Sequence, residues 1–236
     1  MLTAGGTDQE CRLRREVTGG LALSVILAGF FLATLESVVA GLGIERLDAP
    51  ISRFVAARRT VALVDVSRIV TDIGSPWVTV PVAALVVAVL LWRFRWQEAA
   101  LFMAISSGGG DLSALGLKYV VHRVRPPGAL VHLSSFSFPS GHVVGTLALF
   151  AGVTWVLSRH GASRDVRLAA WTGSILLTVA VGVSRIELAV HYTSDVIGAF
   201  ALAGFWLAAA ATLWAARDLR KLRGSGARVT FDTQTR

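Results

Sequence analysis

Three short segments of the sequence carry the side chains whose types and spacing could do chemistry, because each holds a cation or a histidine among other polar residues. Positive side chains that a fold brings together repel one another unless an anion lies between them. The segments therefore indicate a site for an anionic group. In chain order they contain Lys118, Arg123 and Arg125 before Pro126; Pro139, Ser140, Gly141 and His142; and Ser184, Arg185, His191 and Asp195.

The cations and the serine-glycine pair suit a phosphate. Lys118, Arg125 and Arg185 could surround a phosphoryl group, since the arginines offer forked donors to its oxygens. Ser140 and Gly141 lie at the start of a predicted helix, where free backbone N–H groups bind anions. Each cation by itself has a simpler explanation, because a lysine at the end of a span commonly extends its ammonium group to the membrane interface and an arginine in a loop orients the chain. Only the combination indicates a site.

The two histidines add the chemistry of phosphoryl transfer. His191 and Asp195 are four residues apart, which on a helix places the carboxylate beside the ring. The carboxylate can then hold the proton of one ring nitrogen and aim the other nitrogen, as in a catalytic triad. A neutral imidazole so oriented can attack phosphorus, and His142 can give a proton to the leaving oxygen.

The elements that must position these residues are membrane helices. The 236-residue chain is 54% hydrophobic and only 16% charged, with a mean hydropathy of +0.63, which excludes a disordered protein. The single Cys11 excludes a disulfide scaffold. About 20 apolar residues span a bilayer. The sequence predicts an all-α bundle of six transmembrane helices, at 19–42, 73–92, 99–121, 140–157, 168–184 and 194–216.

The distribution of charge predicts the orientation. The net charge of +8 suggests nucleic-acid binding, but the arginines lie between apolar spans, where they orient a membrane protein. With both termini cytoplasmic, 14 Lys and Arg residues lie inside and 8 outside. We therefore expect a multi-pass protein of the cytoplasmic membrane with its site at the outer face and no nucleic-acid partner. It would comprise a cytoplasmic segment 1–18, one membrane domain 19–217, and a cytoplasmic tail 218–236 that we expect to be disordered.

Three features have two interpretations each. The residues 49–71 could form an interfacial helix on the outer surface or a solvated periplasmic loop between the first two spans. The first apolar run could be a cleaved signal peptide, although its length favours a retained helix. Glu36 and Asp111 lie within spans, where interhelical pairing is favoured over a proton path.

The three segments together resemble the signature of the phosphatidic acid phosphatase type 2 superfamily of membrane lipid phosphatases. That signature is K-x6-R-P, then P-S-G-H, then S-R-x5-H-x3-D. The chain matches every part and both internal spacings, from Lys118 to Arg125-Pro126, at 139–142, and from Ser184-Arg185 through His191 to Asp195.

The resemblance implies a role for each matching residue. His191 would be the nucleophile that forms a phosphohistidine, Asp195 would orient it, and His142 would protonate the leaving group and then activate water. The phosphoryl group would be bound by Lys118, Arg125, Ser140, Gly141 and Arg185. Arg123 and Glu187 could contact the substrate headgroup. The resemblance implies no metal and no cofactor, and the sequence contains no carboxylate-rich cluster that suits a divalent ion.

The expected substrate is a lipid phosphate or diphosphate that reaches the site from the bilayer. The compact chain favours undecaprenyl diphosphate, and the alternatives are phosphatidylglycerophosphate, phosphatidic acid, or phosphoryl transfer to another lipid. A membrane transporter is the alternative outside enzymes, but its polar residues would be expected near the midplane and in repeated halves.

Overall fold

The polypeptide is helical along nearly all of its described length. The computed structural model describes residues 4–234, with side chains described for 7–224, and no strand occurs among them. The elements are α1 (Ala4–Ala40), η1 (Gly43–Leu47), α2 (Asp48–Arg58), α3 (Val61–Ile73), α4 (Pro76–Trp92), α5 (Gln97–Met103), η2 (Ala104–Gly108), α6 (Gly109–Val121), α7 (Gly141–Arg159), α8 (Arg164–Glu187) and α9 (Thr193–Gln234).

Six helical stretches in the described part of the chain are long and apolar enough to cross a membrane, which confirms the predicted six-span all-α class. Two of these spans consist of consecutive elements, α3 with α4 and α5 with η2 and α6. The spans are Thr7–Ala40, Val61–Trp92, Gln97–Val121, Gly141–Arg159, Arg164–Glu187 and Thr193–Gly224.

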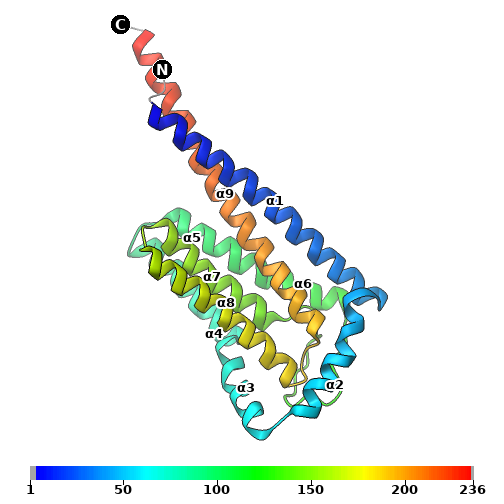
Figure 1. Cartoon of the computed structure of the whole chain (residues 1–236). Coiled ribbons are helices and arrows are strands. Elements are labelled where there is room, and N and C mark those ends of the chain that lie inside the picture. Colours follow the sequence, from blue (N-terminus) through cyan, green and yellow to red (C-terminus); the bar gives the residue numbers. More distant parts are fainter. Residues whose placement is uncertain (1–3, 235–236) are drawn as a thin grey trace.

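Helix α7 is the centre of the bundle, because it packs against α4, α5, α6, α8 and α9. Its buried face includes Val143, Val144 and Leu147, which form one core with residues of α9. Helices α1 and α9 lie side by side along most of their length on one side of this bundle (Figure 1). The start of α7, which carries a signature segment, is therefore held inside the protein rather than against lipid.

The segment between α1 and α4 is largely helical rather than a loop. It forms α2 and α3, and α3 packs along α8 at one end of the bundle (Figure 1). Helix α3 ends at Ile73 and is followed by Gly74, and Pro76 begins α4 after Ser75, whose backbone is extended. A Cβ atom on Gly74 would lie 2.6 Å from Val181 of α8, so this close approach requires glycine.

The C-terminal segment continues α9 as a helix to Gln234, although its polar composition predicts disorder, and residues 235–236 lie outside the described part. Ion pairs hold its first turns: Asp218 lies 2.5 Å from Arg159, which also contacts Glu16 of α1 at 2.8 Å. Within the described residues, Glu36 and Asp111 make no hydrogen bond or ion pair, so the interhelical pairing expected for them is absent. Asp111 instead lies near Gly145 of α7, whose closest neighbour is the Thr79 hydroxyl.

Candidate active site

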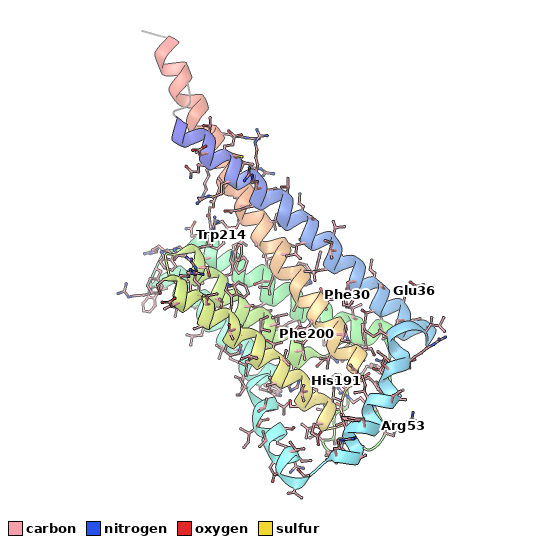
Figure 2. The ribbon with its side chains drawn as sticks, viewed as in Figure 1. Phe30, Glu36, Arg53, His191, Phe200 and Trp214 are labelled. Carbon is pink, nitrogen blue, oxygen red and sulfur yellow. The ribbon has the colours of Figure 1, made fainter. Side chains whose placement is uncertain are left out.

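The three signature segments meet at the end of the bundle where α2 and α3 lie. His191 is at this end, and Trp214 of α9 is at the opposite end (Figure 2). A cavity of about 520 Å³ opens among them. Its wall includes six residues that the sequence assigned to the site: Lys118, Arg125, Gly141, His142, Arg185 and His191.

The start of α7 contributes Gly141 and His142 to the cavity wall. Ser140 has an extended backbone and Gly141 is the first helical residue, so the free N–H groups of this helix end lie at the cavity. The Ser140 N–H donates to the carbonyl of Asp195 at 3.2 Å, which ties this segment to the start of α9. The Ser140 hydroxyl is buried and has no hydrogen-bond partner among the described residues.

The loop that precedes α7 is anchored by an aromatic side chain. Phe138 is fully buried, stacks on Phe31 of α1 at 5.9 Å between ring centroids, and lies against Gly198 of α9. Burial of an aromatic side chain stabilises the folded state by about 1.5–3 kcal/mol. The backbone that carries Ser140 is thereby fixed to two other helices.

Lys118 reaches the cavity from the last turn of α6. Its ammonium group is nearly buried and donates to the carbonyl of Phe136 at 2.7 Å and, at 3.4 Å, to that of Ser137. Helix α6 ends at Val121, and the left-handed backbone of the next residue, His122 (φ 52°), turns the chain toward the arginines that follow.

Arg125 is held by backbone carbonyls beside His191. Its Nε donates to the carbonyl of Ser135 at 2.8 Å, and its Nη1 donates to that of Val190 at 2.5 Å. The same Nη1 lies 3.3 Å from Nε2 of His191. Burial lowers the pKa of Arg125 and the charge of Asp195 opposes this, but a guanidinium remains charged in proteins.

Arg185 offers unused donors to the cavity. Its Nη1 donates to the Thr71 hydroxyl at 2.7 Å, whereas its Nε and Nη2 are buried without a partner in the described structure. Buried donors of this kind are costly unless a ligand accepts from them. With the Ser140 hydroxyl, they indicate that the cavity is built to receive an anion.

His191 is 2% exposed, and its Nδ1 lies 3.3 Å from Oδ2 of Asp195. The expected contact is present, but not on one helix face: His191 precedes α9, and Asp195 lies in the first turn of α9. There its Oδ2 also accepts from the backbone N–H of Tyr192 at 2.9 Å. Burial lowers the pKa of His191 to about 3, because desolvation outweighs the opposing effect of Asp195, so the ring is neutral at pH 7.

Arg123 binds the other oxygen of Asp195 instead of lining the cavity. Its Nη1 lies 2.6 Å from Asp195 Oδ1 and its Nη2 lies 2.7 Å from Asp48 Oδ2. Asp48, at the start of α2, also accepts from the backbone N–H of Ser194 at 2.9 Å. Burial acts to lower the pKa of Arg123, but the charges of Asp195 and Asp48 outweigh it and the pKa is raised.

Glu187 is similarly directed away from the cavity. Its carboxylate lies 3.4 Å from Nε of Arg59, in the connection between α2 and α3, and both side chains are largely buried. The pair joins this connection to the end of α8. The structure thus brings neither Glu187 nor Arg123 into the cavity wall, where the sequence had suggested a headgroup contact.

Asp48 and the cavity-facing residues of α3 were not predicted from the sequence. The role of Asp48 could not be predicted from the sequence, because it is a single aspartate in a connecting segment. Helix α3 also contributes to the cavity wall, and here a signal exists: its polar residues recur at helical spacing. They are Arg68, Thr71 and Asp72, and Ser75, which follows the helix, also lines the cavity. In the part of the chain that the structure describes, no group of three or more His, Cys, Asp or Glu side chains could hold a metal ion.

The six-helix fold and a cavity lined by cations and histidines define an integral membrane phosphatase. Residues 98–219 match the PAP2 superfamily, and the chain belongs to this superfamily. It is a lipid phosphate hydrolase. The chain is 30% identical, over 73% of its length and 85% of the relative's, to phosphatidylglycerophosphatase B of Bacillus subtilis.

A solved structure agrees with this assignment. The crystal structure of a transmembrane PAP2-type phosphatidylglycerolphosphate phosphatase from Bacillus subtilis superposes with a TM-score of 0.70 at 28% identity. The match covers 80% of this chain and 94% of that one. The fold and the signature therefore agree, and the transporter alternative is excluded.

Proposed function

We propose that this protein removes the terminal phosphate of phosphatidylglycerophosphate at the outer face of the membrane. The observation that carries the chemistry is the cavity, whose wall contains both a buried, neutral His191 and the unused donors of Arg185. The preference for this lipid rests on the phosphatidylglycerophosphatase relatives. Undecaprenyl diphosphate, which the sequence alone favoured, has no comparable support.

The first step is attack on phosphorus. Lys118, Arg125 and Arg185 bind the phosphoryl oxygens, together with the Ser140 hydroxyl and the Gly141 N–H. Asp195 holds the Nδ1 proton of His191, so Nε2 presents its lone pair to phosphorus. A phosphorus–nitrogen bond forms, the phosphorus–oxygen bond to the glycerol breaks, and protonated His142 gives its proton to the leaving alcohol.

The second step releases phosphate. His142, now neutral, takes a proton from a water molecule that attacks the phosphohistidine, and the phosphorus–nitrogen bond breaks. Inorganic phosphate leaves and His142 is protonated again. Transfer to a lipid alcohol would differ only in the nucleophile of this step, so phosphoryl transfer is the second candidate.

The orientation follows from charge. A single membrane domain, 19–217, has a cytoplasmic segment 1–18 and a cytoplasmic tail 218–236, because Lys and Arg residues are more numerous on that side. The site then faces outward, and the lipid tail extends into the bilayer while its headgroup enters the cavity.

The test is phosphate release by the purified protein from phosphatidylglycerophosphate, phosphatidic acid and undecaprenyl diphosphate. Wild-type protein is expected to turn over phosphatidylglycerophosphate fastest and to trap labelled phosphate on a histidine, whereas His191→Ala releases and traps none. Arg53→Ala, an exposed change on α2, serves as the control. Full activity of His191→Ala would refute the mechanism, and fastest turnover of undecaprenyl diphosphate would refute the substrate.

A further inference from the structure

Helix α3 has a polar stripe that faces the cavity and an apolar surface elsewhere. Arg68, Thr71 and Asp72 follow the spacing of one helix face and line the cavity, and Ser75, just beyond the end of α3, lines it with them. Val66 and Ile69, on other faces, are exposed apolar side chains that suit contact with lipid. The polar stripe is thus a wall of the substrate site and lies opposite the signature segments.

Two neighbours on this stripe behave differently. The Thr71 hydroxyl accepts from Arg185 at 2.7 Å and so positions a phosphate-binding side chain. Asp72 is exposed in the cavity wall, and its carboxylate makes no hydrogen bond or ion pair within the described part of the chain. Ser75 does not compete for the same ligand, since its hydroxyl accepts from the N–H of Trp77 at the start of α4.

A carboxylate in a phosphate site needs a physical reason. The signature segments contribute three cations to this wall, Lys118, Arg125 and Arg185, whereas Asp72 comes from α3 and is negative. A negative charge near the bound phosphate repels it and weakens binding. A carboxylate, however, only accepts hydrogen bonds, and it accepts strongly from a neutral hydroxyl group. Asp72 therefore fits a substrate that carries a hydroxyl donor beside its phosphate.

We propose that Asp72 accepts a hydrogen bond from a free hydroxyl of the alcohol that bears the phosphate, and so makes the site selective for phosphomonoesters of polyol headgroups. This inference rests on the proposed function and specifies its substrate class. In phosphatidylglycerophosphate, the carbon next to the phosphorylated one carries a free hydroxyl. In phosphatidic acid the corresponding oxygen is acylated, and a polyprenyl diphosphate has no such hydroxyl.

The test measures kcat/KM of the full-length protein for three lipids. They are phosphatidylglycerophosphate, its analogue with hydrogen in place of the free hydroxyl, and phosphatidic acid. Wild-type protein should prefer the first to its deoxy analogue by about tenfold or more, as expected for a hydrogen bond to a charged group. Asp72→Ala should lose that preference, while Asp72→Glu, which keeps the acceptor, should retain part of it.

The comparison of the two analogues isolates the hydrogen bond. Any general effect of removing a negative charge changes both substrates equally, because they carry the same phosphates, and so cancels in the ratio. Asp165→Ala, which removes an exposed carboxylate at the start of α8, is the matched control and should keep the wild-type ratio. Thermal unfolding of Asp72→Ala in detergent, compared with the wild type, reports that the variant is folded.

Three results would overturn the proposal: an unchanged ratio in Asp72→Ala, no preference for the hydroxyl in wild-type protein, or loss of all three activities in a folded Asp72→Ala. The last two would show, respectively, that the hydroxyl is not recognised and that Asp72 acts on every substrate alike. Failure of the proposed function is a separate outcome, since wild-type protein would then release phosphate from none of the lipids.

Discussion

Arg123 and Asp195 form a buried ion pair with 2.6 Å between Nη1 and Oδ1, and the other oxygen of the same carboxylate lies against His191. Asp195 is completely buried, so its charge needs a partner on each side. Arg123 in turn is paired with Asp48 of α2, which is 2% exposed. The helix between the first two spans is therefore joined to the histidine of the site through two salt bridges.

Arg123→Ala should reduce kcat and leave KM nearly unchanged. Removal of the guanidinium leaves Asp195 without a partner on one oxygen, so His191 is held less firmly, while the cavity wall keeps its cations. We expect a loss of kcat of about tenfold to a hundredfold, with partial recovery in Arg123→Lys. Steady-state kinetics with Arg53→Ala as the exposed control would measure this. An increase in KM at constant kcat would instead indicate a headgroup contact.

Asp48→Asn should destabilise the protein and, like Arg123→Ala, should lower kcat. Breaking one member of a buried ion pair costs about 3–5 kcal/mol, since the remaining charge stays buried. The effects of Asp48→Asn and Arg123→Ala on kcat should be far from additive, because both act through the same carboxylate. Thermal unfolding in detergent and a double-mutant cycle would test this. Additive effects would show that Asp48 and Arg123 act independently.

The stability of the wild-type protein should fall at mildly acidic pH because of His191. Its pKa is about 3 in the folded protein and 6.5 ordinarily, so the unfolded chain binds a proton between these values and the folded one does not. The contribution of the neutral His191 ring to the free energy of unfolding is fully present above pH 6.5 and is lost progressively as the pH falls toward 3. At about pH 5 the loss from this group is about 2 kcal/mol.

His191→Gln is the comparison that isolates this group. When the pH is lowered from 7.5 to about 5, the unfolding midpoint of the wild type should fall by more than that of His191→Gln. A difference that does not change with pH would show that the folded and unfolded states bind the proton equally.

The two ends of the bundle should label from opposite sides of the membrane. Cys11 is exposed near the start of α1, at the end away from the cavity, and is a natural reporter for that side. An impermeant maleimide should label Cys11 only after permeabilisation. Arg53→Cys in a Cys11→Ser background should label in intact cells, because α2 lies at the cavity end. The reverse pattern would invert the proposed orientation.

Chelation should leave the activity intact. The described side chains include no group of three or more metal-binding residues, and the cations of the cavity can stabilise the phosphoryl oxygens themselves. Phosphate release in excess EDTA should therefore stay within about twofold of the untreated rate. Complete loss of activity that a divalent ion restores would contradict this prediction.

The parts of the fold that the sequence predicts are those that depend on local composition. Hydropathy locates all six spans, because about 20 consecutive apolar residues are needed to cross a bilayer whatever surrounds them. It misses the break at Gly74, since α3 and α4 are both apolar and only Ser75 and Pro76 separate them. It likewise misses the continuation of α9, which depends on ion pairs with α1, α5 and α7.

The membrane class and the three signature segments could be predicted from the sequence, because apolar runs and the residue spacing within a short segment do not depend on the surrounding fold. The residues that surround these segments could not, because they are set by how the helices pack. Asp48 and Arg123 are 75 positions apart, and Thr71 and Arg185 are 114 apart. Such contacts depend on how helix ends meet, which no periodicity encodes. Because of such contacts Arg123, for which the sequence suggested a headgroup contact, pairs with Asp195 instead, and Asp72 lies in the wall of the phosphate cavity.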